Sequence, residues 1–328
     1  MRDVPHDSIV GTSLRKSYDW LLNRDLVASA YSTYVGAWTT LTSRYPIGTN
    51  IYEREWDLLI LLDTCRVDAL REVADDYEFL GEINRLLSVG STSNEWIANT
   101  FVDQYASEIS ETAYVSANGY AERVLEDGIY PEVYIGGRRS PPSLTADRTV
   151  DHETFGELDY AWKRGESEYE GHIPPRVVTD RAIELGREGE YDHIALHYSQ
   201  PHAPYTVAAQ CEDRERREYE ENPFSALRSG TDRSLVWEAY LEELRSVLDE
   251  VELLIENFDA DTVAITADHG EAFGEYGIYG HLPGLLHPDV KYVPWVVTSG
   301  TDSQEYTPSQ YNQTTTNTRE HLEALGYI

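Results

Sequence analysis

Cysteine is scarce in this chain: Cys65 and Cys211 are the only two among 328 residues. Two thiols are too few for a zinc site built from cysteine, so a metal site here has to use other ligands. They suffice for one disulfide, but Cys65 falls in a segment that we expect to be buried core. We therefore expect two reduced thiols.

Positive charge is scarce as well. The chain has 26 Lys and Arg against 59 Asp and Glu, a formal net charge of −33, and the acidic residues are spread along the whole sequence. Such a surface is typical of a protein adapted to high salt, where counterions screen the self-repulsion. It excludes free nucleic acid as a partner, because binding a phosphate backbone requires a basic footprint.

A long hydrophobic run is also missing. The first residues are acidic and polar where a secretory signal needs an apolar stretch. Residues 26–43 carry no charge, but Ser, Thr and Tyr make them too polar for a spanning helix. We expect a cytoplasmic protein with no integral membrane segment, in which 26–43 is the segment suited to peripheral membrane contact. Residues 1–50 are expected to form an N-terminal helical extension, and residues 51–328 a single domain.

Short apolar runs recur along the rest of the chain, separated by stretches of helical periodicity. Continuous apolar runs suit strands that are buried on both faces of a parallel sheet. Their alternation with helices predicts an α/β fold, with a doubly wound, mostly parallel sheet flanked by helices. The expected strands are 56–63, 112–118, 132–137, 193–199, 261–268 and 293–299, the expected helices are roughly 94–107, 176–188 and 234–258, and the polar stretches 138–172 and 210–233 are expected to be surface excursions.

Potential metal ligands stand where two of these strands end. Asp63 closes the first strand, and the pair Asp268 and His269 closes the strand at 261–268. Ligands of a doubly wound sheet bind outside the carboxyl ends of its strands. Two carboxylates and an imidazole suit Mn²⁺, Zn²⁺ or Mg²⁺. Asp63 alone is equally consistent with a helix cap, and Asp268 with His269 equally consistent with a turn, but together they favour a metal site.

Two loops add candidate reactive groups. His202 has prolines on both sides, which can hold its imidazole toward the same edge of the sheet as a donor to an anionic oxygen. Residues 90–94 (Gly-Ser-Thr-Ser-Asn) run into a helix, whose positive end favours an alkoxide and an anionic substrate. The same pattern is that of an ordinary N-cap reinforced by Glu95, so both interpretations remain open at this point.

Three segments together resemble the sulfatase branch of the alkaline phosphatase superfamily. They are LLILLDTCRVDAL, the PHAPY loop, and VAITADHGEAFGEYGIYGH followed by KYVPWVV, and the resemblance covers roughly residues 56 to 300. It implies an alkaline phosphatase-like catalytic domain in residues 51–328. It further implies that Asp63, Asp268 and His269 hold one divalent metal ion, with Mn, Zn, Mg and Ca all open.

The resemblance also assigns the nucleophile and the substrate contacts. Setting Asn94 where sulfatases have a proline after their nucleophile places Thr92 at the nucleophile position, where it also touches the metal. The Gly-x-Thr-Ser run of lipoteichoic acid synthases falls on Thr92 too, and Ser91 and Ser93 are the alternatives. The residues implied in substrate binding are Ser93, Asn118, His202 and His281, and both histidines are implied in catalysis.

Two departures from the family narrow the chemistry. Sulfatases convert the Cys or Ser of a Cys/Ser-x-Pro/Ala-x-Arg motif to formylglycine, and the loop after Thr92 has neither the proline nor the arginine. Two-metal phosphatases need an Asp four residues before a His, and Tyr198 stands at that distance before His202. What remains is a one-metal site with an unmodified hydroxyl nucleophile.

These observations predict a metal-dependent hydrolase or transferase acting on phosphate-type esters. Its expected substrate is a small-molecule, lipid-linked or glycan-linked anionic ester. One alternative is a sulfatase that hydrolyses sulfate esters of glycans. The other is a non-catalytic, sulfatase-like scaffold in envelope or glycan assembly.

Overall fold

The computed structural model describes residues 47–128, 148–164 and 172–311, together with the short pieces 29–30, 33–34, 37–38, 134–135 and 138–139. Within these residues, the central sheet consists of β1 (Leu58–Leu62), β2 (Asn84–Leu87), β3 (Thr112–Ser116), β6 (Glu157–Tyr160), β7 (His193–Tyr198), β8 (Ala260–Thr266) and β11 (Tyr292–Gly300). The strand order is β2-β11-β8-β1-β7-β3-β6. Only β11 runs antiparallel to its neighbours in this sheet, β8 and β2. The predicted α/β class is therefore confirmed.

The central strands are apolar throughout because both faces of the sheet are covered. Alternate residues of a strand face opposite sides. In β1, Leu58, Ile60 and Leu62 belong to one hydrophobic core, whereas Leu59 and Leu61 belong to the other. A single apolar face would have left every second leucine in water.

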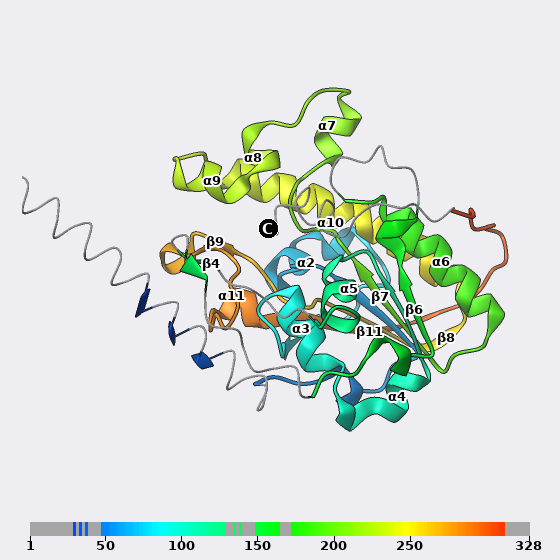
Figure 1. Cartoon of the computed structure of the whole chain (residues 1–328). Helices are drawn as coiled ribbons and strands as arrows, with labels where there is room; N and C mark the ends of the chain where they lie inside the picture. Colours follow the sequence, from blue (N-terminus) through cyan, green and yellow to red (C-terminus); the bar gives the residue numbers. More distant parts are fainter. Residues whose placement is uncertain are drawn as a thin grey trace, which may run out of the picture.

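Helices supply the other half of each core (Figure 1). The first core contains residues of α2 (Val67–Val73), α6 (Pro175–Glu188) and α10 (Arg233–Ile255). The second contains residues of α3 (Ser93–Thr100), α4 (Ala106–Ser110) and α5 (Tyr120–Leu125). Between residues 172 and 311 the structure also contains the α-helices α7 (Val207–Cys211), α8 (Glu218–Glu221), α9 (Pro223–Arg228) and α11 (Pro288–Lys291).

Several details differ from the sequence-based prediction. The described part of the expected strand 132–137 is β4 (Tyr134–Ile135), which pairs with β5 (Arg138–Arg139) outside the central sheet. The helix expected at 94–107 is interrupted between α3 and α4, where Val102 forms a β-bridge with Thr149. The edge strands β2 and β6 were not predicted, and β6 lies inside an expected surface excursion. Edge strands border solvent, so NRLL and ELDY lack a continuous apolar run.

The N-terminal region is described only in part. The helical extension was predicted for residues 1–50. Residues 29–30, 33–34 and 37–38 are helical, residues 47–50 are not, and the remaining residues of this segment lie outside the described ones. The Tyr34 and Trp38 rings stack with centroids 6.3 Å apart, and the Tyr34 hydroxyl lies 3.5 Å from the Gly284 carbonyl oxygen. The division at residue 50 stays a prediction.

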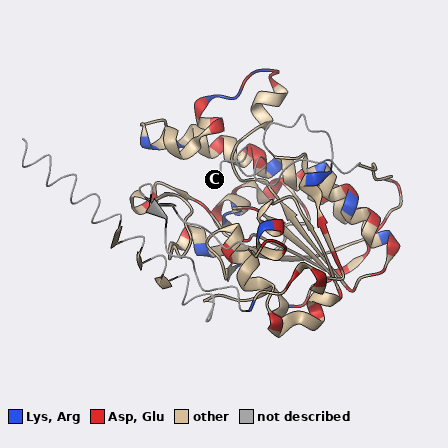
Figure 2. Ribbon diagram, viewed as in Figure 1, with Lys and Arg blue, Asp and Glu red and all other residues tan. Residues whose placement is uncertain are grey.

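The surface agrees with the composition. Figure 2 shows Asp and Glu distributed over helices and loops around the whole fold, with Lys and Arg in fewer places. Among the described residues, no helix is both long enough and apolar enough to span a membrane.

Candidate metal centre and active site

Three side chains converge at the carboxyl edge of the sheet. Asp63 follows β1, Asp268 follows β8, and His197 is the penultimate residue of β7. Because β7 and β8 flank β1, these positions meet, and one ligand atom from each lies within 4.8 Å of the other two. All three side chains are 0% exposed. The structure thus brings together the two predicted carboxylates and adds an imidazole that was not predicted.

This cluster has the composition of a cation site. Two buried carboxylates at such a distance require a compensating positive charge. His197 Nε2 is 3.5 Å from Asp268 Oδ2, too long for a strong hydrogen bond, and neither atom has a hydrogen-bond partner among the described residues. A divalent cation would satisfy both atoms. A proton on His197 is the alternative, because Asp268 raises the pKa of this imidazole against the opposing effect of burial.

His269 is oriented as a further ligand. Its Nδ1 lies 2.9 Å from the Gly270 carbonyl oxygen, to which it donates, and its Nε2 lies 3.4 Å from Asp268 Oδ2 and 3.8 Å from Asp63 Oδ1. Burial lowers the pKa of His269 to about 4, so its ring is neutral near pH 7 and keeps a lone pair on Nε2. Backbone carbonyls commonly fix metal-binding histidines in this way.

The two neighbouring hydroxyls Thr92 and Ser93 point in different directions. The Thr92 hydroxyl donates to Asn94 Oδ1 at 2.5 Å and caps α3 by accepting from the Glu95 backbone N–H at 3.4 Å. The Ser93 hydroxyl lies 3.3 Å from Asp63 Oδ2 and 3.4 Å from His269 Nε2. The hydroxyl beside the candidate metal ligands is therefore that of Ser93, whereas Thr92 serves as the helix cap.

Asn118 also lies at this edge, after β3. Its amide Nδ2 donates to Asp63 Oδ2 at 2.9 Å, and its Oδ1 accepts from the Tyr120 backbone N–H at 2.9 Å. The predicted substrate contact is thus directed at the Asp63 carboxylate in this structure. Asn118 fixes the orientation of that carboxylate.

A second cluster adjoins the first and consists of His202, Glu271 and His281, whose ligand atoms lie within 4.8 Å of one another. His281 Nδ1 lies 3.0 and 3.1 Å from the two Glu271 carboxylate oxygens. The His281 ring lies 4.3 Å from the His269 ring and 5.4 Å from the His202 ring, measured between centroids. Both predicted substrate-binding histidines therefore border the candidate metal centre.

The two histidines have opposite electrostatic surroundings. Burial and the neighbouring His281 lower the pKa of His202 well below its usual value. Burial also opposes the charged form of His281, but the Glu271 carboxylate outweighs it and raises the pKa. Such a pair offers a neutral imidazole and a proton donor side by side, which is a common arrangement for acid–base chemistry.

Sequence analysis missed His197 and Glu271. His197 had a weak signal, because it is a polar residue near the end of an otherwise apolar, buried strand. Glu271 lies two residues after His269, but its pairing with His281 depends on the return of the chain through β9 (Ala272–Phe273) and β10 (Tyr279–Gly280). No periodicity in the sequence predicts that pairing.

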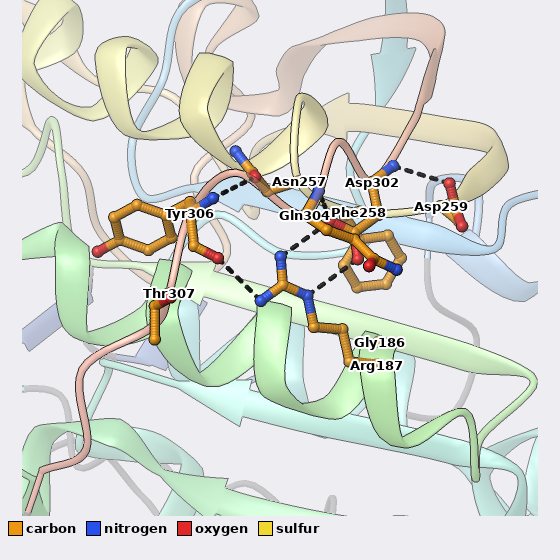
Figure 3. Close-up of a pocket in the computed structure, with 9 residues that line it drawn as sticks. All are labelled: Gly186, Arg187, Asn257, Phe258, Asp259, Asp302, Gln304, Tyr306 and Thr307. Atoms are coloured by element: carbon orange, nitrogen blue, oxygen red, sulfur yellow. Dashed lines mark hydrogen bonds and ion pairs between the residues drawn. The ribbon is translucent and has the colours of Figure 1, made fainter.

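A polar hollow of 460 Å³ lies at the opposite end of β8 from Asp268 (Figure 3). The Arg187 guanidinium lines this hollow. It donates to both carboxylate oxygens of Asp302 at 2.9 Å and to the Tyr306 carbonyl oxygen at 2.9 Å. The lining residues are Gly186, Arg187, Asn257, Phe258, Asp259, Asp302, Gln304, Tyr306 and Thr307. This hollow shares no residue with the candidate site.

Comparisons with known proteins gave structural matches only. No model of a protein family matches the chain, and no curated protein matches it. The chain is similar to the soluble domain of lipooligosaccharide phosphoethanolamine transferase A from Neisseria meningitidis, with a TM-score of 0.47 and 13% identity over 76% of this chain and 77% of that one.

Two other solved structures are similar to a comparable extent. One is the C-terminal periplasmic domain of phosphoethanolamine transferase EptC from Campylobacter jejuni, with a TM-score of 0.43 and 15% identity over 74% of this chain and 78% of that one. The other is the lipoteichoic acid synthase LtaP from Listeria monocytogenes, with a TM-score of 0.42 and 13% identity over 77% of this chain and 66% of that one.

Proposed function

We propose that this chain is a metal-dependent hydrolase or transferase of phosphate-type esters, with Ser93 as its nucleophile. The observation that carries the proposal is the position of the Ser93 hydroxyl, within 3.4 Å of both Asp63 and His269 in a buried cluster of carboxylates and imidazoles. A serine placed only for packing would not need such neighbours. This assignment selects Ser93 from the three hydroxyls that the sequence left open.

The residues that would hold one divalent ion are Asp63, His197, Asp268 and His269, with Ser93 Oγ beside them. When bound, such an ion lowers the pKa of an adjacent hydroxyl and stabilises negative charge on phosphoryl oxygens. Asn118 keeps Asp63 in place through its amide.

The chain's own groups suit a two-step displacement. In the first step Ser93 Oγ forms a bond to phosphorus as the bond from phosphorus to the leaving oxygen breaks. The hydroxyl proton passes toward Asp63 Oδ2, which already faces it. His281 donates a proton to the leaving oxygen, and His202 contacts a phosphoryl oxygen. Water, or an acceptor hydroxyl, then attacks phosphorus and gives its proton to His281, while the bond from phosphorus to Ser93 Oγ breaks and Ser93 recovers its proton from Asp63.

Substitution of the two neighbouring hydroxyls tests the assignment. Ser93→Ala should lower kcat on an aryl phosphate ester by at least about a thousandfold while the metal content is unchanged, because it removes the attacking atom. Thr92→Ala should lower the free energy of unfolding by about 1 kcal/mol through loss of the cap, and keep most turnover. A quenched reaction analysed by mass spectrometry should show the phosphoryl group on Ser93. Turnover that survives in Ser93→Ala but disappears in Thr92→Ala would make Thr92 the nucleophile.

Two measurements on the purified protein distinguish the proposed phosphoester enzyme from a sulfatase and from a non-catalytic scaffold. Parallel assays with aryl phosphate and aryl sulfate esters distinguish a phosphoester enzyme from a sulfatase. Metal content after purification distinguishes both from a scaffold, which has no reason to retain an ion. The proposal for Ser93 predicts phosphate turnover together with bound metal.

A further inference from the structure

Two buried polar side chains beside the nucleophile have no role in the proposed chemistry. Ser91 is 0% exposed and Glu95 is 4% exposed. The Ser91 backbone N–H and hydroxyl lie 2.7 and 2.6 Å from Glu95 Oε2. A Glu at the third position of a helix often turns back to the residues before it, so this contact alone would be an ordinary helix start.

The same two side chains also hold the turn that follows His281, here called the 282–285 turn. Ser91 Oγ lies 2.9 Å from the Leu282 carbonyl oxygen and accepts from the Leu285 backbone N–H at 3.1 Å. Glu95 Oε2 accepts from the Gly284 backbone N–H at 3.4 Å. An ordinary helix start does not require these contacts, which cross about 190 residues of chain.

We propose that Ser91 and Glu95 are positioning residues, which set the separation between Ser93 and His281. The inference rests on the proposed function. Ser93 lies between Ser91 and Glu95 in the chain, and the 282–285 turn begins directly after His281. The backbone on one side of His281 is thereby tied to the start of α3, while Glu271 holds its ring.

Geometry explains why such a link matters. In the proposed reaction Ser93 and His281 act on the same phosphorus centre, one at the attacking oxygen and the other at the leaving oxygen. A displacement of about 1 Å between reacting groups lowers a rate by about 100-fold. Because the two groups come from loops far apart in sequence, a direct contact between the loops is the shortest way to fix their spacing.

The test compares Ser91→Ala and Glu95→Ala with Thr112→Val as matched control. Thr112 is equally buried, and its hydroxyl donates to the Glu108 carbonyl oxygen and accepts from Tyr52, away from the site. Ser91→Ala and Glu95→Ala should each lower kcat on an aryl phosphate by about 10- to 100-fold, with KM and metal content within about twofold of wild type. Thr112→Val should lower the melting temperature and keep kcat per metal-loaded molecule. Glu95→Gln keeps an acceptor oxygen and should retain kcat within about threefold.

Two further readouts keep the outcomes distinct. Amide hydrogen exchange at Gly284, whose N–H donates to Glu95 Oε2, should be faster in Glu95→Ala than in wild type, and the covalent intermediate should still form on Ser93 in that variant. If the wild type is active and kcat is unchanged in both Ser91→Ala and Glu95→Ala, the positioning role is wrong and the proposed function stands. An intermediate on Ser91 would make that residue the nucleophile and also overturn it. Wild type that binds metal but turns over no ester overturns the proposed function and this inference together.

Discussion

Adjacent residues at a helix start have different tasks in this protein. Thr92 has the extended backbone of an N-cap, with φ −152° and ψ 156°, and its side chain turns back to the helix. Ser93 is the first helical residue, and its side chain points toward Asp63 instead. The backbone changes from extended at Thr92 to helical at Ser93, so the two side chains leave it in different directions. This change separates a cap from a candidate nucleophile.

Loss of a single ligand should remove the effect of metal on stability. An ion that binds only the folded state at 100 times its Kd adds about 2.7 kcal/mol to the free energy of unfolding. We expect His197→Gln and Asp268→Asn to abolish most of the rise in melting temperature that Mn²⁺ or Zn²⁺ gives the chelator-treated protein. Asp180→Asn is the control, since Asp180 is an equally buried carboxylate that binds Tyr306 and Tyr311 instead. A full metal-induced rise in His197→Gln would exclude His197 as a ligand.

Glu243 should make stability depend on pH. This buried carboxylate of α10 accepts from the Thr206 and Val207 backbone N–H groups, and burial raises its pKa from 4.5 to about 6. An acid whose pKa is raised in the folded state stabilises the fold fully below pH 4.5 and loses that contribution as pH rises through about 6. The shift corresponds to about 2 kcal/mol.

Glu243→Gln keeps an acceptor for those N–H groups and removes the charge. The variant should therefore gain about 2 kcal/mol relative to wild type between pH 4 and pH 7, measured by urea unfolding. Glu242→Gln, an exposed neighbour on the same helix, should follow the wild-type curve. If the free energy of unfolding changes with pH to the same extent in wild type and in Glu243→Gln, Glu243 is not the source of the pH dependence.

At the scale of elements, the loop after β8 is packed tightly against α11. A Cβ added at Gly270 would lie 2.1 Å from the Asp289 carbonyl oxygen, so the two backbones are in close contact. The Gly270 N–H also donates to the Val290 carbonyl oxygen at 2.8 Å. The position of Asp268 and His269 therefore depends on α11 as well as on the sheet.

Gly270→Ala should separate these two elements. We expect both the melting temperature and the affinity for metal to fall, because the loop that carries Asp268 and His269 has to move away from α11. Gly81→Ala is the matched control, since a Cβ there meets nothing within 4 Å. Unchanged metal affinity in Gly270→Ala would show that the loop tolerates the displacement. Calorimetry and a metal titration on both variants measure the two quantities.

At the scale of the whole molecule, the charge of −33 opposes folding in dilute buffer. Many acidic side chains are paired locally, as in the Arg181 contacts with Glu157 and Asp159, but 59 acidic residues exceed the 26 basic ones. The acidic side chains in excess repel one another, and dissolved salt screens this repulsion.

The melting temperature should rise with KCl concentration. The increase should be steepest below about 1 M, where the Debye length falls from about 10 Å at 0.1 M to about 3 Å. Sucrose is the control, because it favours compact states without screening charge. A melting temperature that does not change across the KCl series would contradict the expectation of salt adaptation.

The sequence by itself determined the central strands and the side chains at their ends. Continuous apolar runs such as 58–62 are local patterns, and Asp63 and Asp268 follow such runs directly. The fold class follows from the same patterns. The edge strands escaped prediction because half-exposed strands carry no comparable pattern.

Only the tertiary structure decided the composition of the site. The strand order places β7 beside β1, which adds His197, and the return through β9 and β10 adds Glu271. Side-chain direction at the start of α3 turns Ser93 toward the candidate ligands and Thr92 away from them. These features depend on contacts between distant segments and on the change from extended to helical backbone between Thr92 and Ser93. Local sequence patterns encode neither of them.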